Sequence, residues 1–235
     1  DSIDRERRPV LIFNTDSTEF IVNLMACWIS RRPVVPVCLP TRKRFDFINF
    51  IIEQTGSIIY TIDENHSQVF KLRSNTSCLL SNLAEVTQDS FSSASSSYLL
   101  SKPNYPPTTA VIQFSSGSTG TPKGVLITAS NMLSSLELMS GIWNISPKSR
   151  FYSWLPLYHD LGLIFGILLP LMNGCCSYII SSADFAKKPS VWLCHLSSFS
   201  ISHTAGSTSG YAMASTQNYP DNVSLETCEY CMIAA

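Results

Sequence analysis

Apolar residues along the chain fall into short runs separated by segments with helical spacing. Val10–Asn14 is a short apolar run typical of a buried strand. Over residues 17–30, Phe20, Leu24 and Trp28 recur every four positions, as on one face of a helix. A strand followed by a helix and another strand predicts parallel pairing with right-handed crossovers.

The same alternation continues to the last residues. The expected strands are Val10–Asn14, Val34–Leu39, Ser57–Thr61, Ala110–Phe114, Arg150–Leu155, Cys175–Ile180, Ser200–Ala205 and Glu229–Ile233. The expected helices are 17–30, Phe45–Gln54, Ser130–Gly141, Leu161–Met172, Lys188–Ser198 and Ser209–Gln217. This order predicts a layered α/β/α fold with largely parallel sheets.

A Ser- and Pro-rich stretch interrupts the alternation at residues 81–109. Residues 90–97 are mostly serine, and Pro103, Pro106 and Pro107 follow them. Such a composition is typical of an exposed linker or flexible loop. We therefore expect a first α/β portion over 1–80 and a second over 110–235, both within one domain.

Composition and charge narrow the class of protein. Apolar residues make up 45% of the chain and charged residues 14%, with a net charge of −1. This composition fits a globular protein and gives no electrostatic reason to expect nucleic acid as a partner. The uncharged stretch Leu161–Ile180 has the length of a membrane span, but Gly, Pro and Asn interrupt it. We expect a buried helix and strand there, no membrane span and, without a secretory signal at the start, a cytoplasmic protein.

Eight cysteines are scattered along the chain, mostly within apolar runs. This pattern predicts buried free thiols in a reducing compartment. Cys228 and Cys231 form a C-x-x-C pair, but no second pair completes a zinc site. We expect a buried final strand there and no metal ligands, with a metal or redox role as the alternative.

The segment Ser115–Gly124 carries the strongest chemical signal. It reads SSGSTGTPKG and follows an expected strand. Its glycines permit backbone amides to converge on an anion, its hydroxyls add donors, and Lys123 adds a positive charge. These features predict a loop that binds the phosphates of ATP through Ser115, Ser116, Gly117, Ser118, Thr119, Gly120, Thr121, Lys123 and Gly124. The alternative is an ordinary surface turn, and the spacing excludes a Walker loop.

This string resembles the phosphate loop of the adenylate-forming superfamily over its full length. The stretch 154–163, WLPLYHDLGL, is similar to the W-L-P-x-Y-H-D-M-G-L stretch of fatty acyl-AMP ligases, and Val35-Pro36-Val37 is similar to their V-P-V. The resemblance runs through almost the whole chain. It implies that these residues correspond to the first half of the large N-terminal domain of an adenylate-forming enzyme.

The resemblance also implies a reaction. A fatty carboxylate attacks the α-phosphorus of ATP, Mg²⁺ offsets the phosphate charge, and the acyl group then passes to the thiol of an acyl carrier protein or of coenzyme A. By resemblance, His159 positions the substrate, Phe165 and Ile167 line the acyl tunnel, and Gly206 and Ser207 form the pocket wall. The alternatives are a structural turn residue for His159 and core packing for the apolar helix.

The family's Y-G-x-T-E stretch and its catalytic lysine are not among these 235 residues. By resemblance, the isolated chain is therefore expected to be inactive. Three interpretations remain open: part of an active fatty acyl-AMP ligase, a truncated non-catalytic protein that binds a nucleotide, lipid or partner, and a fragment of an acyl-CoA synthetase.

Overall fold

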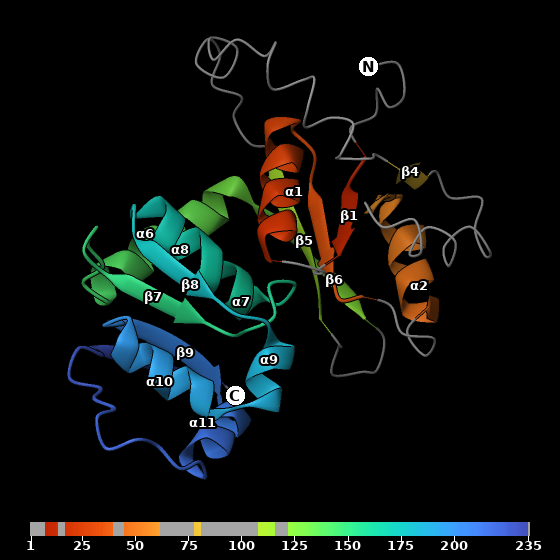
Figure 1. The fold of residues 1–235 in the computed structure, drawn as a ribbon. Coiled ribbons are helices and arrows are strands. Elements are labelled where there is room, and N and C mark those ends of the chain that lie inside the picture. The colour runs from red at the N-terminus through yellow and green to blue at the C-terminus, as the bar shows by residue number, and fades with distance from the viewer. Residues whose placement is uncertain are drawn as a thin grey trace, which may run out of the picture. The chain divides into compact units, whose positions relative to one another are not determined.

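A computed structural model describes residues 8–13, 17–39, 45–61, 78–80, 108–115 and 122–234 (Figure 1). The chain divides into two compact units, the first made of residues 1–15 and 19–129 and the second of residues 16–18 and 130–235. The expected linker over 81–109 lies outside the described residues except for its last two positions.

The first unit contains a mostly parallel sheet. Its described strands are β1 (Val10–Phe13), β2 (Val34–Val37), β3 (Ile58–Thr61), β4 (Cys78–Leu80), β5 (Thr109–Ser115) and β6 (Lys123–Thr128), and its helices include α1 (Ser17–Ile29) and α2 (Phe45–Thr55). The strand order is β4-β3-β1-β2-β5-β6, and β5–β6 is the antiparallel pair among them. Strand β6 was not expected from the sequence, because its glycine and lysine obscure the apolar run that follows.

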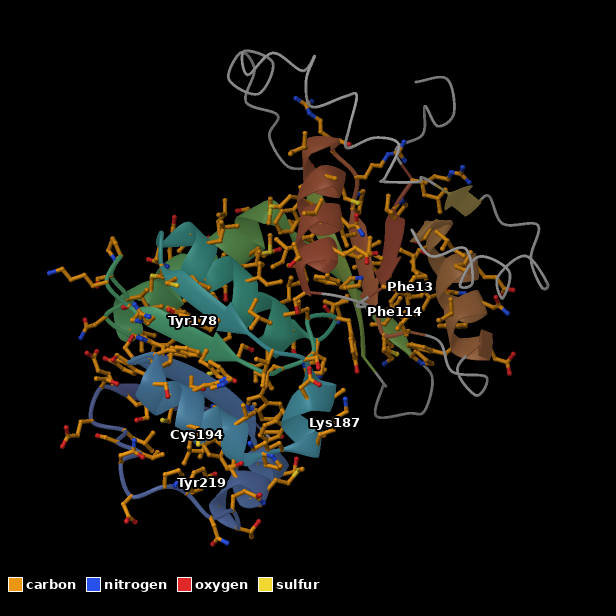
Figure 2. The ribbon with its side chains drawn as sticks, viewed as in Figure 1. Phe13, Phe114, Tyr178, Lys187, Cys194 and Tyr219 are labelled. Atoms are coloured by element: carbon orange, nitrogen blue, oxygen red, sulfur yellow. The ribbon has the colours of Figure 1, made fainter. Side chains whose placement is uncertain are left out.

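The two helices of this unit cover opposite faces of the sheet. Side chains alternate along a strand, so Leu11 and Phe13 point to the face opposite Val10 and Ile12. The Leu11 face packs against α2 in a cluster that Phe114 joins from β5 (Figure 2). The members of that cluster are Leu11, Phe13, Val35, Val37, Ile48, Ile51, Ile52, Ile59 and Ile112. Val10 instead lines a pocket with residues of α1, which covers the other face.

Local sequence explains where α2 ends. Gly56 has a φ of +62° just after the helix, a left-handed conformation that glycine adopts without steric cost. Its amide donates to the carbonyl of Ile52 at 2.8 Å. The chain then turns directly into β3, as the sequence predicted.

The second unit contains an all-parallel sheet in the order β10-β9-β7-β8. Its strands are β7 (Arg150–Ser153), β8 (Cys176–Ile179), β9 (His203–Ser207) and β10 (Tyr230–Ala234). Its helices are α6 (Ala129–Ile142), α7 (Asp160–Leu163), the π-helical segment η2 (Ile164–Leu168), α8 (Leu169–Met172), α9 (Ser182–Lys187), α10 (Ser190–Ser198) and α11 (Thr208–Ser215).

Neighbouring residues of β7 define the two faces of this sheet. Phe151 contacts Phe165 of η2, with ring centroids 5.2 Å apart. The next residue, Tyr152, bonds to His195 of α10 on the opposite face. Helices thus cover both faces in each unit, and the prediction of a layered α/β fold with largely parallel sheets is confirmed.

Two expectations from the sequence were wrong in detail. Of the cysteines whose side chains the structure describes, Cys27 is buried and Cys176 and Cys231 are exposed. The partly exposed ones are Cys38, Cys175, Cys194 and Cys228. Strand β10 is not buried either, because its residues alternate between partly exposed and exposed, with Ile233 64% exposed. The run Leu161–Met172 is helical as expected, and no helix among the described residues is both long and apolar enough to cross a bilayer.

Candidate nucleotide and acyl site

The predicted phosphate loop joins the two strands of a β-hairpin. Ser115 at the end of β5 pairs with Lys123 at the start of β6, and Phe114 pairs with Gly124. Ser116, Gly117, Ser118, Thr119, Gly120 and Thr121 lie outside the described residues. Because β5 is parallel to β2, the loop follows the carboxyl end of a parallel strand, where ligands bind in open α/β sheets.

A pocket of about 680 Å³ lies where the strands of this hairpin meet the loop. Pro122, Lys123 and Gly124 contribute one side of it, and Gln54 and Thr55 of α2 contribute another. The Lys123 side chain is exposed, so its ammonium group is free to reach an anion. Sequence reasoning missed the contribution of α2, because sequence spacing does not show which helix end meets the hairpin.

Gly124 has a packing role besides its place in the loop. A Cβ atom at this position would lie 3.0 Å from the ring of Phe114, its cross-strand partner. The Phe114 ring in turn contacts Phe47 of α2 edge-on, with centroids 6.4 Å apart. A small residue at 124 therefore allows the hairpin to pack closely on the core of the first unit.

In the second unit, His159 stands just before the first turn of α7. Its backbone is extended, and its carbonyl accepts a hydrogen bond from the amide of Leu163 at 2.9 Å. The imidazole Nδ1 touches the carboxylate of Asp160, and both side chains are more than half exposed. The structure thus leaves His159 accessible to a ligand.

Close backbone packing shapes the turn that carries His159. A Cβ atom at Gly162 would lie 2.1 Å from the carbonyl oxygen of Pro156, so only glycine fits there. The helix continues through the π-helical turn η2, and such turns occur frequently at functional sites. Its carbonyl at Gly166 accepts a hydrogen bond from Ser177 of β8 at 2.8 Å.

The predicted acyl-lining residues Phe165 and Ile167 are buried in η2, with exposures of 1% and 5%. The Phe165 ring packs against Phe151 of β7 and against Trp143, whose centroid lies 6.0 Å away. These contacts belong to the core of the second unit. A role in lining an acyl tunnel stays a prediction.

Gly206 and Ser207 end strand β9. A Cβ atom at Gly206 would lie 2.5 Å from the ring of Trp192, so Gly206 faces α10 on the opposite side of the sheet from Phe165. Ser207 caps α11, because its hydroxyl accepts the amide of Gly210 at 3.1 Å. A role of these two residues in the wall of a substrate pocket stays a prediction.

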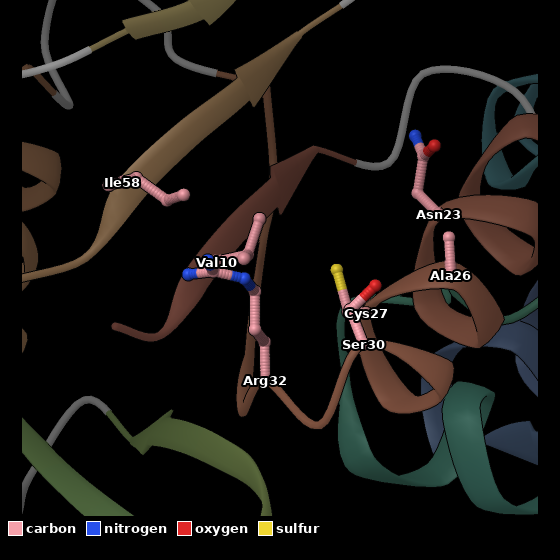
Figure 3. Close-up of a pocket in the computed structure, with 7 residues that line it drawn as sticks. All are labelled: Val10, Asn23, Ala26, Cys27, Ser30, Arg32 and Ile58. Atoms are coloured by element: carbon pink, nitrogen blue, oxygen red, sulfur yellow. The ribbon is translucent and has the colours of Figure 1, made fainter. Parts of the chain in front are cut away.

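A second pocket, of about 200 Å³, lies on the α1 face of the first unit (Figure 3). Val10 and Ile58, the first residues of β1 and β3, line it together with Asn23, Cys27 and Arg32. Burial raises the pKa of the Cys27 thiol to about 12, against a smaller opposing effect of Arg32, so the thiol stays protonated. This pocket lies at the amino ends of the strands, the edge opposite the hairpin loop.

No metal site is formed by the described side chains alone. Within the part of the chain that the structure describes, no three His, Cys, Asp or Glu side chains gather closely enough to hold a metal ion.

Comparison with known proteins agrees with the fold. The chain is 28% identical over 216 residues to the medium-chain-fatty-acid–[acyl-carrier-protein] ligase JamA of Moorena producens, which covers 89% of this chain and 36% of JamA. It is 40% identical over 92 residues to the long-chain-fatty-acid–AMP ligase FadD23 of Mycobacterium tuberculosis, covering 37% of this chain and 16% of FadD23.

Solved structures of fatty acyl-adenylate ligases share the fold. A ligase structure from a study of the E. coli and L. pneumophila enzymes matches with a TM-score of 0.80 at 23% identity, over 99% of this chain and 43% of that chain. The L. pneumophila enzyme in complex with acyl adenylate and pyrophosphate matches with a TM-score of 0.78 at 21% identity, over 96% and 40% of the two chains. The present chain thus spans less than half the length of these relatives. The family model described as "AMP-binding enzyme" matches residues 3–233, and the chain belongs to that family.

Proposed function

We propose that this chain is the phosphate-binding part of an ATP-dependent fatty acyl-AMP ligase. The observation that carries the proposal is the string SSGSTGTPKG, which joins β5 and β6 at the carboxyl edge of a parallel sheet in a chain of the AMP-binding family. Loops of this composition offer convergent amides and hydroxyls to a polyphosphate. Lys123 adds a charge-assisted contact at the end of the loop.

In this proposal the chain binds and orients ATP. Ser115, Ser116, Gly117, Ser118, Thr119, Gly120, Thr121 and Gly124 surround the β- and γ-phosphates together with Lys123. The carboxylate oxygen of a fatty acid attacks the α-phosphorus, the bond from that phosphorus to the bridging oxygen breaks, and pyrophosphate leaves. Catalysis of this kind depends mainly on positioning and on electrostatic stabilisation of the phosphates.

Mg²⁺ enters this proposal as a companion of ATP. Protein sites for Mg²⁺ commonly combine one or two carboxylates with substrate phosphates and water. The described side chains supply no cluster of their own, so the phosphate oxygens of ATP would be the main ligands. The ion would offset the charge of the phosphates while the loop holds them.

The residues proposed to meet the fatty acid all belong to the second unit. His159 is exposed at the start of α7, which suits a group that meets the carboxylate end of the substrate. Phe165 and Ile167 follow in η2 and are proposed to border the acyl chain, with Gly206 and Ser207 in the pocket wall. The relatives JamA and FadD23 are named for medium-chain and long-chain fatty acids, which supports a fatty carboxylate as the substrate class.

The proposal is tested by fatty-acid-dependent exchange of labelled pyrophosphate into ATP. The assay uses the gene-encoded protein that contains this chain, with fatty acids of several lengths and a control without acid. Exchange that requires the acid, with acyl-AMP identified by mass spectrometry, would support the proposal. Absence of exchange with every acid, in a protein that still binds ATP, would favour the non-catalytic interpretation.

The acceptor is identified by a second step of the same assay. Acyl-AMP formed by the protein is supplied with a phosphopantetheinylated acyl carrier protein or with coenzyme A, and the thioester is quantified. We expect transfer to the carrier protein, as the name of JamA indicates for that relative. Transfer to coenzyme A alone would identify an acyl-CoA synthetase instead.

A further inference from the structure

Two thiols meet at the start of the last strand of the second unit. The Sγ atoms of Cys228 and Cys231 lie 3.3 Å apart. Cys231 is exposed and Cys228 is partly exposed, so small reagents can reach the pair. A disulfide bond is about 2.05 Å long, so a small side-chain movement suffices to join the two sulfur atoms.

The backbone holds both cysteines in place. Before the strand, the amide of Cys228 donates to the carbonyl of Leu225 at 2.9 Å. The amides of Glu229 and Tyr230 both donate to the carbonyl of Ser202, at 2.9 and 3.0 Å. Cys231 then pairs in register with Thr204 of β9. The short distance between the thiols is therefore fixed by the sheet edge.

The surroundings make the two thiols unequal. A hydrogen bond from Cys228 lowers the pKa of Cys231 to about 7 against the opposing effect of burial, and Tyr211 adds a further hydrogen bond. Hydrogen bonding to Cys231 raises the pKa of Cys228, and burial and the Glu229 carboxylate raise it further. Cys231 is thus the better nucleophile near neutral pH, and Cys228 is placed to resolve what Cys231 forms.

We propose that Cys228 and Cys231 form a redox-reactive dithiol that is oxidised to an intramolecular disulfide by small disulfide compounds. The Cys231 thiolate attacks one sulfur of the compound RSSR, its S–S bond breaks, and RS⁻ leaves and takes up a proton. Cys228 then loses its proton and attacks Sγ of Cys231, which releases the second RS⁻. Two protein thiols are oxidised and one RSSR is reduced to two RSH.

The sequence offers a direct way to detect this link. Cleavage after glutamate separates the two cysteines, because Glu229 lies between them. The full chain is incubated with glutathione disulfide, its remaining thiols are alkylated, and it is digested without reductant. We expect two peptides joined through Cys228 and Cys231 that separate on reduction.

Three variants assign the roles of the thiols. Cys231→Ser should abolish the link, whereas Cys228→Ser should stop at a glutathione adduct on Cys231. Cys176→Ser removes another exposed thiol and should leave the link unchanged. The proposal is overturned if the linked peptides are absent from the oxidised wild-type chain, or if Cys228→Ser carries no more adduct on Cys231 than on Cys176.

Alkylation of the unmodified chain provides a measurement that does not depend on whether a variant folds. Iodoacetamide should modify Cys231 faster than Cys176 at neutral pH. The alkylation rate of Cys231 should reach half of its maximum near the pKa of about 7. In urea this preference should disappear, because it depends on the folded contacts. Equal rates at both thiols in the folded chain would refute the special reactivity of Cys231.

Discussion

The indole N–H of Trp192 donates to the hydroxyl oxygen of Thr204 at 2.8 Å, and both side chains are fully buried. The same hydroxyl donates its own hydrogen to the carbonyl of Tyr152 at 3.1 Å. One side chain therefore joins α10, β9 and β7. The loss of that hydroxyl leaves a buried donor and a buried acceptor without their partner.

Thr204→Val should therefore destabilise the chain although valine has nearly the same shape. Leaving buried hydrogen-bonding groups unpaired costs about 1–3 kcal/mol. The free energy of unfolding in urea should fall by that amount in the variant. Thr216→Val, at an exposed position at the end of α11, is the control and should stay within about 0.5 kcal/mol of the parent chain. Equal effects of the two changes would contradict the proposed role of Thr204.

Two helical glycines provide a second, matched test. A Cβ atom at Gly210 in α11 would lie 2.4 Å from the Trp154 ring, whereas one at Gly141 in α6 meets nothing within 4 Å. Gly210→Ala should cost about 1–3 kcal/mol by overpacking. Gly141→Ala should be neutral or stabilise by up to about 1 kcal/mol, since alanine favours helix. A melting temperature that falls in Gly210→Ala and stays or rises in Gly141→Ala would agree with this packing. A drop of the same size in both variants would contradict it.

Lys123→Ala should weaken the use of ATP by the protein that contains this chain. Removal of one charge-assisted contact costs about 1.5–3 kcal/mol, which is roughly a ten- to hundredfold loss. We expect this loss in kcat/KM for ATP and a matching increase in the Kd of ATP. Lys148→Ala, which removes another exposed lysine, is the control. A variant at 123 with unchanged ATP kinetics would remove Lys123 from the site.

His195 should make the stability of the chain depend on pH. Burial lowers its pKa from the ordinary value of 6.5, and its Nδ1 lies 2.9 Å from the Tyr152 hydroxyl. Below pH 6.5 the unfolded chain binds a proton that the folded chain resists, so stability is full above that pH and falls as the pH drops toward the folded pKa. Urea unfolding between about pH 7.5 and pH 5 should show this decrease.

His195→Gln should flatten that part of the pH profile, because glutamine does not titrate. A profile for His195→Gln that runs parallel to that of the parent chain would show that another group causes the pH dependence.

Most of the fold was predictable from the sequence, because the spacing of apolar residues and the positions of turn-forming residues indicate the same helices and strands. The spacing of Phe20 and Leu24 gave α1, and Gly56 marked the end of α2. Strand β6 was missed, because among the described strands it pairs with β5 alone and its residues are mostly exposed. A strand that forms through its partner leaves little periodicity of its own.

The candidate site was predictable only where its residues are contiguous in the sequence. A continuous string such as Ser115–Gly124 is visible in the sequence, whereas the Gln54 and Thr55 side of the pocket depends on tertiary packing. The reactive pair Cys228 and Cys231 was visible as a spacing. The exposure of Cys231 was not visible, because an apolar run does not reveal that its strand lies at the edge of the sheet.

The pairing of Ser115 with Lys123 also restricts how the loop between them can vary in length. If one inserted or deleted residue were absorbed by sliding β6 along β5, every side chain of β6 would move to the other face of the sheet. Lys123 would then move to the face that packs toward α2, and Leu126 would leave that face. Natural variants of this segment should therefore tolerate substitutions far better than single-residue changes in length.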